Sequence, residues 1–227
     1  MIAELPDSII IGVINVAVGG CKIEHFHSTM NASKVASEAD WFKNYRKAYD
    51  YNPYKRLVAV AKEAQKFGVI KGMLLHQGES NNGDQEWPTK VKRVYLELCR
   101  DLGLDKTTTP LLAGEMVQQD QGGICYGHNS VIATLPKTIT TAHVISSKDC
   151  PAAADGLHFT AEGYRMIGKR YAECMLSILK EQQAAVIRET PAERRETRDG
   201  VFSLAGQRVD ENFKGMVIKN GKKCIQR

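Results

Sequence analysis

The sequence lacks several features that would assign a protein to a class at once. It has no apolar run near the ~18 residues that span a bilayer, so no membrane span is expected. None of its six cysteines forms a Cys-x-x-Cys pair, which argues against a zinc site or a thioredoxin-type motif. It does not begin with a basic stretch followed by a long apolar one, so we predict no signal peptide in these residues.

The chain also lacks a large excess of either positive or negative charge. The chain carries 31 Lys and Arg against 26 Asp and Glu, a formal net charge of +5 that is too small and too spread out for a nucleic-acid footprint. The hydrophobic fraction of 43% and the charged fraction of 25% are ordinary for a globular protein. A length of 227 residues allows one α/β domain with an appendage.

Apolar runs and helical spacings alternate along the chain. This order predicts an α/β fold with a parallel sheet and helices on both faces, in which ligand sites form beyond the carboxyl ends of the strands. The predicted strands are residues 9–18, 69–75, 111–114 and 141–146, and the predicted helices are residues 54–67, 88–102, 129–135 and 160–178, the last capped by Thr160.

Changes in composition along the chain divide it into a predicted domain, a linker and a C-terminal extension. Residues 1–182 form the predicted domain, and the polar residues 183–199 are predicted to be a linker. Residues 200–227 are predicted to form a small β-hairpin extension that turns at Asn220-Gly221, a dipeptide typical of tight hairpin turns. Two cysteines of the predicted domain, Cys125 and Cys150, lie in predicted loops. They are interpreted as buried free thiols, with pairing left open if the protein is exported.

A carboxylate stands three residues before an imidazole in Asp155-Gly156-Leu157-His158, just ahead of the last predicted helix. A hydrolase needs such a pair: His158 would be the general base, and Asp155 would hold its other ring nitrogen. So short a pattern leaves open an incidental Asp and a surface His in a helix-entry loop.

A second polar cluster, residues 76–81, directly follows a predicted strand. Gln77 could donate to a developing oxyanion, and Glu79 could support His158. The alternative is a polar turn with His76 packed at the strand end. Gly19-Gly20, after the first apolar run, could expose backbone N–H groups to an oxyanion or could simply form a tight strand exit.

A metal site is a competing interpretation of the same residues. Three nitrogen or oxygen ligands plus water make a catalytic zinc site, but the i,i+4 histidine spacing of known zinc motifs is missing. No metal and no cofactor are therefore expected. The candidate ligands are His76, Glu79, Asp155 and His158.

The sequence shows no activated serine. Gly78-Glu79-Ser80-Asn81-Asn82 lacks the second glycine of a nucleophile elbow. Ser146 and Ser147 follow a predicted strand, but nothing marks either as a nucleophile.

Three blocks, in this order, resemble the SGNH-type carbohydrate esterases, in particular the acetyl xylan esterases of carbohydrate esterase family six and the sialate O-acetylesterase-like proteins. The likeness covers roughly residues 9–180. It implies a three-layer, flavodoxin-like α/β fold and the removal of acetyl groups from a carbohydrate substrate without a metal. The blocks are residues 11–24, His76-Gln77-Gly78-Glu79-Ser80-Asn81 and Asp155-Gly156-Leu157-His158-Phe159-Thr160.

The resemblance also implies roles. His158 matches the family's base, and either Asp155 or Glu79 matches its acidic partner. The oxyanion and substrate-binding region corresponds to Gly19, Gly20, Gln77, His76 and Asn81.

In these esterases the nucleophilic serine lies in a Gly-x-Ser-Asn block after the first strand, upstream of the block that begins here. We therefore expect this chain to lack the first strand of the fold and that serine, and to be inactive alone.

The sequence is also compatible with two other functions. One is a non-catalytic glycan-binding or scaffold remnant, and a less favoured one is a metal-dependent hydrolase. The tail from Gly200 resembles C-terminal extensions of exported proteins from gut Bacteroidetes-type bacteria. Export of the full-length form, to the periplasm, the cell surface or the medium, is therefore expected.

Overall fold

The structure, a computed structural model, describes residues 5, 9–189, 201–203, 208–210, 213–219 and 222–226. The chain divides into two compact units, Met1–Ile178 and Leu179–Arg227.

The first unit is built on a parallel three-stranded sheet. Strands β1 (Met73–Leu75), β2 (Leu111–Gly114) and β3 (Ala142–Ile145) lie in the order β1-β2-β3, and all four residues of β2 are buried. Because both pairings are parallel, the three carboxyl ends meet at one edge. The predicted α/β fold with a parallel sheet is confirmed.

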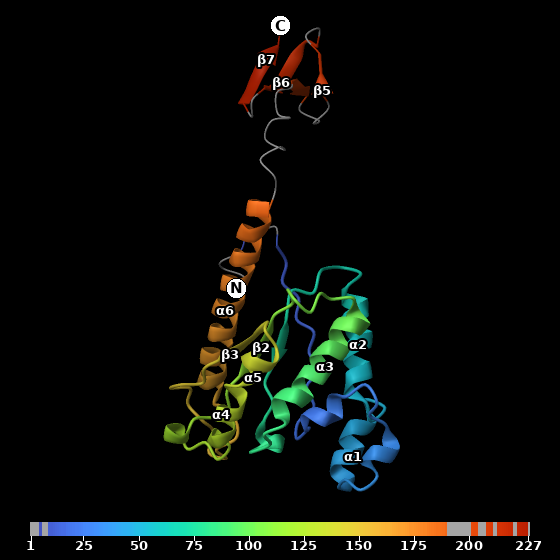
Figure 1. Ribbon diagram of the computed structural model, residues 1–227, viewed down its shortest axis with the longest axis vertical. Helices are drawn as coiled ribbons and strands as arrows, with labels where there is room; N and C mark the ends of the chain where they lie inside the picture. Colours follow the sequence, from blue (N-terminus) through green and yellow to red (C-terminus); the bar gives the residue numbers. More distant parts are fainter. Residues whose placement is uncertain are drawn as a thin grey trace. The chain divides into compact units, whose positions relative to one another are not determined.

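Helices lie on both sides of the strands (Figure 1). On one side are α2 (Pro53–Ala64) and α3 (Trp87–Leu102), and on the other is the first part of α6 (Ala161–Glu189). The Tyr171 hydroxyl of α6 donates to the carbonyl oxygen of Leu75, at the end of β1, with an O···O distance of 2.6 Å. These contacts give the three-layer arrangement that the order of elements predicts.

Local sequence signals explain where these helices begin and end. Pro88 stands in the first turn of α3, where its missing N–H costs nothing, and Gly103 ends the helix in the left-handed region with φ of 64°. The Asn52 side chain accepts from the Lys55 amide at the start of α2. Thr160 caps α6 as predicted, its Oγ1 accepting from the Gly163 amide at 3.2 Å.

Short helices fill the connections. The helix predicted over residues 129–135 is two separate turns, because Pro136, in the first turn of the second, has no N–H to continue the first. These short elements are η2 (Ile23–Phe26), η3 (Ala32–Val35), α1 (Asp40–Lys47), η4 (Glu79–Asn81), η5 (Gln119–Gln121), η6 (Tyr126–His128), α4 (Asn129–Ile132) and α5 (Leu135–Thr138).

The strand predicted over residues 9–18 is wrong. The segment belongs to neither sheet, and Ile10 and Val13 are 93% and 78% exposed. An apolar run indicates side chains suited to burial, but a strand also needs a neighbouring strand whose backbone groups complete the ladder. Among the described residues, 9–18 have no such neighbour.

The second unit contains more strands than the predicted hairpin. Its four-stranded antiparallel sheet has the order β5-β4-β6-β7, and Asn220 and Gly221 lie outside the described residues. The predicted linker is also partly helical, since α6 continues to Glu189, and residues 190–199 lie outside the described ranges. The strands are β4 (Val201–Ser203), β5 (Arg208–Val209), β6 (Gly215–Lys219) and β7 (Lys222–Gln226).

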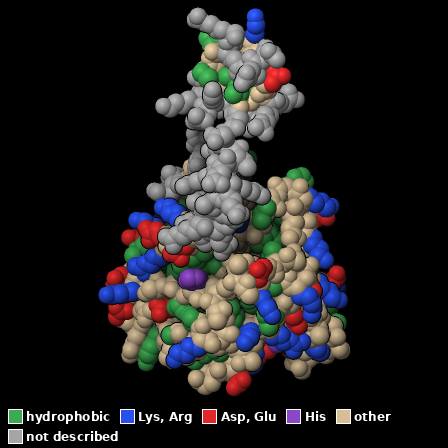
Figure 2. Space-filling model, turned by 45° about the horizontal axis from the view of Figure 1, so that its top comes forward, with side chains coloured by type: hydrophobic (Ala, Val, Ile, Leu, Met, Phe, Trp, Pro, Cys, Tyr) green, Lys and Arg blue, Asp and Glu red, His purple; other side chains and the backbone are tan. Residues whose placement is uncertain are grey.

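The surface of the first unit is mixed in charge. Basic and acidic side chains are intermixed on the visible face of the first unit (Figure 2). Of the described helices, none combines the length and the apolarity needed to cross a bilayer. Cys125 and Cys150 are buried free thiols.

Candidate active site

An aspartate and a histidine are bonded at the entry to α6. Nδ1 of His158 lies 2.6 Å from Oδ2 of Asp155, and the two side chains are 65% and 47% exposed. The other carboxylate oxygen, Oδ1, accepts from the backbone N–H groups of Leu157 and His158 at 2.9 Å each. The pair predicted from Asp-x-x-His spacing therefore forms.

The same bonds set the charge of the aspartate. Hydrogen bonds from the His158 backbone, the His158 ring and the Leu157 backbone hold the pKa of Asp155 far below its usual range. The carboxylate is therefore an ionised acceptor that favours the proton on Nδ1 of His158. The basic lone pair is left on Nε2, on a ring open to solvent.

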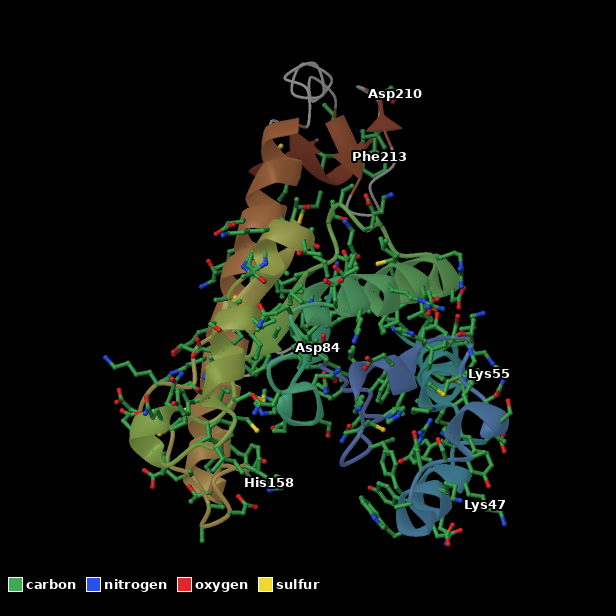
Figure 3. The ribbon with its side chains drawn as sticks, turned by 60° about the horizontal axis from the view of Figure 1, so that its bottom comes forward. Lys47, Lys55, Asp84, His158, Asp210 and Phe213 are labelled. Carbon is green, nitrogen blue, oxygen red and sulfur yellow. The ribbon has the colours of Figure 1, made fainter. Side chains whose placement is uncertain are left out.

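A glycine contact holds this loop in place. Gly156 has φ of 66°, and its carbonyl oxygen accepts from the Ile124 amide at 3.0 Å. The Ala153 amide donates to the carbonyl oxygen of His158 at 2.8 Å, which closes the loop on itself. Figure 3 shows His158 in this loop, ahead of α6, at the face turned toward the viewer.

His76 joins the same neighbourhood. Its ring centroid is 5.7 Å from that of Phe159, the residue after His158, and its Nε2 is 3.9 Å from Oε1 of Glu79. Burial lowers the pKa of His76, the Glu79 charge opposes this shift, and a positive charge on His158 adds to it. The structure therefore brings the blocks at 76–81 and 155–160 together.

The two predicted acidic partners differ in what they bind. Asp155 bonds directly to His158, whereas Glu79 faces His76. No contact between Glu79 and His158 is recorded among the described residues. Of the two carboxylates, Asp155 is the one that the structure places in hydrogen-bond contact with the His158 ring.

The side-chain amides of Gln77 and Asn81 are hydrogen-bonded to other residues of the protein. Gln77 donates to the carbonyl oxygen of Cys21 at 3.2 Å and to Oδ1 of Asn81 at 2.9 Å, and it accepts from the Trp87 indole at 2.6 Å. Asn81, 5% exposed, also accepts from the Ile23 amide at 2.8 Å. These side chains hold the segment after Gly20 against the end of β1, and they do not offer free donors.

A charged cluster beside Asn81 was not found from the sequence. Lys90 of α3 lies 2.6 Å from both a Glu24 and an Asp84 carboxylate oxygen, and Asn81 donates to both carboxylates. The bond from Lys90 lowers the pKa of Asp84 and, together with the bond from Asn81, lowers that of Glu24 against the effect of burial. Asn81, Asp84 and Lys90 lie close together in sequence, but Glu24 lies 66 residues before Lys90, so no local pattern revealed the whole cluster.

The glycine turn lies beside this cluster. Gly20 has φ of 73°, which favours glycine, and its carbonyl oxygen accepts from the Ser80 hydroxyl at 3.0 Å. A Cβ on Gly19 would meet nothing within 4 Å, so that position is open.

One of the two serines after β3 is not exposed: the Ser147 hydroxyl is fully buried and donates to the Met116 carbonyl oxygen at 2.6 Å.

Another residue missed from the sequence is His128. Its side chain is fully buried and packs edge-on against Trp87, with 5.3 Å between the ring centroids. Neither ring nitrogen has a hydrogen-bond partner in the part of the chain that the structure describes. Burial lowers its pKa, with Asp84 and Glu79 opposing. A lone histidine in a loop gives no sequence signal of such burial.

Among the described residues, no group of three or more His, Cys, Asp or Glu side chains is arranged to hold a metal ion.

A parallel sheet covered by helices on both sides, with an Asp–His pair beyond its carboxyl edge, defines an α/β protein of the SGNH-hydrolase type. Residues 1–177 match the family described as carbohydrate esterase, sialic acid-specific acetylesterase, and the chain belongs to that family.

A solved structure is also similar. The X-ray structure of a protein from Arabidopsis thaliana is 28% identical, with a TM-score of 0.47, over 55% of this chain and 52% of that chain. This chain thus spans about half the length of that relative.

Proposed function

We propose that this protein is the histidine-bearing part of a carbohydrate O-acetylesterase that acts on acetylated xylan or on O-acetylated sialic-acid-like sugars. Family membership supports the acetylesterase class. The observation that carries the proposal is the 2.6 Å bond from Asp155 to Nδ1 of His158, on a ring that is 65% exposed at its side chain.

The reaction follows from this pair. A serine hydroxyl attacks the acetyl carbonyl carbon while Nε2 of His158 takes its proton, and the imidazolium then gives that proton to the departing sugar oxygen. Water hydrolyses the acetyl-serine in the same way and releases acetate. Throughout, the Asp155 carboxylate orients the ring and stabilises its positive charge.

The glycine turn is the proposed oxyanion site. Backbone N–H groups at Gly19 and Gly20 would stabilise the charge that develops on the acetyl oxygen. Gln77 supports this site by its bond to the Cys21 carbonyl oxygen, directly after the turn. Its role is to position the turn.

The nucleophile is proposed to come from outside residues 1–227. Among the described residues no hydroxyl is recorded as bonding to Nε2 of His158, and the Ser80 hydroxyl is bonded to Gly20. The exposure of Ile10 and of Leu74 in β1, 93% and 62%, supports a further apolar strand beside the sheet. Such a strand would carry the Gly-x-Ser-Asn block of the family.

The test compares two forms of the protein. Residues 1–227 and a longer in-frame gene product that contains a Gly-x-Ser-Asn block are assayed for acetate release from acetylated xylan and from an O-acetylated sialic acid. We expect activity that is sensitive to a serine reagent only in the longer form, and a loss of about 100- to 10,000-fold on His158→Ala.

Three results would contradict the proposal. Serine-reagent-sensitive activity of residues 1–227 would show that the nucleophile is already present. Unchanged activity of His158→Ala in the longer form would remove His158 from the mechanism. Glycan binding without acetate release from either form would favour a non-catalytic glycan-binding protein. Among the described residues no hydroxyl bonds to Nε2 of His158, an observation that also favours this second candidate.

A further inference from the structure

A polar pocket of about 550 Å³ opens at the carboxyl edge of the sheet, apart from the Asp155–His158 pair. Glu115 follows the last residue of β2, and Ser146 follows the last residue of β3. Parallel α/β folds bind ligands beyond the carboxyl ends of their strands, so the pocket lies where a ligand is expected. It is lined by Glu115, Gln118, Gln119, Asp120, Ser146 and Lys148.

The floor of the pocket is fixed by hydrogen bonds. Oε2 of Glu115 accepts from the Gln118 side chain at 2.8 Å and from the backbone of the buried Ser147 at 3.0 Å. The Arg170 guanidinium donates to the carbonyl oxygens of Ser146 and Lys148 at 2.8 and 2.7 Å. A ligand would therefore bind a surface that is already ordered, which lowers the entropy cost of binding.

The rim offers groups without recorded partners. Among the described residues, no hydrogen bond or ion pair is recorded for the side chains of Gln119, Asp120 or Lys148, which line the same pocket. One Lys against two carboxylates, Glu115 and Asp120, gives the lining residues a charge of −1, which the Arg170 guanidinium bonded to the Ser146 and Lys148 carbonyl oxygens balances to zero. Amides and carboxylates bind hydroxyl groups well, and a site without net charge offers a charged ligand no electrostatic gain.

The pocket is tied to the Asp155–His158 loop through the chain. The segment from η5 reaches Gly122, against which Gly156 packs, and then Ile124, whose amide bonds to Gly156. A ligand held at Gln119 and Asp120 is thereby kept at a defined place relative to His158.

From this arrangement we propose that the pocket binds a neutral sugar unit of the glycan, other than the unit whose acetyl group is removed. The proposal rests on the proposed function for the presence of a glycan. It adds a second binding site, built from η5 and the turns after β2 and β3, that would select substrates by a sugar without charge.

The test uses residues 1–227 and needs no esterase activity. Unacetylated xylotetraose is titrated into the ¹⁵N-labelled protein, and backbone amide shifts are followed by NMR. We expect shifts at Gln119, Asp120 and Lys148, and binding about three- to tenfold weaker in Gln119→Ala and in Asp120→Ala, as for the loss of one hydrogen bond. Gln121→Ala, in the same η5 but outside the lining, is the matched control and should bind as the parent does.

Other outcomes decide against the pocket. No shifts at millimolar xylotetraose, or shifts that Gln119→Ala and Asp120→Ala leave unchanged, would overturn the proposal. Equal or tighter binding of trigalacturonic acid would overturn the preference for a neutral sugar. Failure of the esterase assay with these shifts present would contradict the proposed function and leave the sugar site standing, so the two failures are distinguishable.

Discussion

Gly156 packs so closely on Gly122 that a Cβ at position 156 would lie 2.6 Å from the carbonyl oxygen of Gly122. The contact joins the loop that carries the Asp155–His158 pair to the segment after η5. The position of His158 therefore depends on the absence of a side chain two residues away.

Gly156→Ala should lower the free energy of unfolding by about 1 to 3 kcal/mol, since alanine is strained at φ of 66° and its methyl group meets the Gly122 carbonyl. Urea unfolding measures the change. Gly127→Ala is the control, because a Cβ there meets nothing within 4 Å, and it should leave stability unchanged or raise it by up to about 1 kcal/mol. Equal stability of the two variants would show that the 156–122 contact is not made in solution.

Asp155→Asn should change the tautomer of His158. The ionised carboxylate fixes the proton on Nδ1, and a neutral amide holds it less firmly, so ¹⁵N NMR should show more of the Nε2–H form. In the longer, active form, kcat/KM should fall by about 10,000-fold. Asp149→Asn serves as the control, since Asp149 is exposed and makes no recorded bond to His158. An unchanged tautomer in Asp155→Asn would argue against the orienting role of Asp155.

Asn81→Ala should destabilise the first unit by about 2 to 4 kcal/mol, because it leaves the Ile23 amide and the Gln77 side chain without their acceptor in a buried place. The neighbouring exposed Asn82, changed to Ala, should alter stability by no more than about 0.5 kcal/mol. Thermal and urea unfolding of both variants test the difference. A similar small effect for both would mean that Asn81 does not anchor the segment after Gly20.

Acid should destabilise the protein below about pH 6.5, the ordinary histidine pKa. Burial lowers the pKa values of His27, His76 and His128, so the folded state binds fewer protons than the unfolded chain. Stability from these groups is complete above that pH and is lost as the pH falls toward the lowered pKa values. The urea midpoint should therefore be lower at pH 5.5 than at pH 7.5, a range in which exposed carboxylates of the unfolded chain stay ionised.

His128→Leu tests one source of this effect. Within the described ranges both ring nitrogens of His128 lack hydrogen-bond partners. An apolar side chain of similar volume therefore removes a group that resists protonation without breaking a hydrogen bond that the structure shows. The difference between the two midpoints should shrink. A difference as large as in the parent would assign the pH dependence to the other histidines.

Local patterns carried much of the fold. The helical spacing over residues 88–102 predicted α3, the short apolar run at 111–114 predicted β2, and Thr160 marked the start of α6. Each signal depends on neighbours within one or two turns of the chain, which is why it can be recognised without coordinates. The Asp155–His158 pair is also a short-range signal, since its two members are three positions apart in the sequence.

Contacts between residues that are distant in the sequence could not be predicted from such short-range signals. The apolar run at 9–18 shows the composition of a strand, yet it joins no sheet, because a ladder is decided by the partner as much as by the run itself. The amides of Gln77 and Asn81 were available to a ligand on sequence grounds, and they are bound to Cys21 and Ile23 instead.

Short-range spacing specified α2, α3 and the start of α6, the three parallel strands and the bonded carboxylate and imidazole, but it did not indicate α1. Three further outcomes came from the packing of the folded chain: Asp155 and not Glu79 meets His158, Lys90 joins Glu24 to Asp84, and His128 is buried with no hydrogen-bond partner among the described residues. Those outcomes depend on which distant segments pack together, and side-chain polarity alone does not specify the partner.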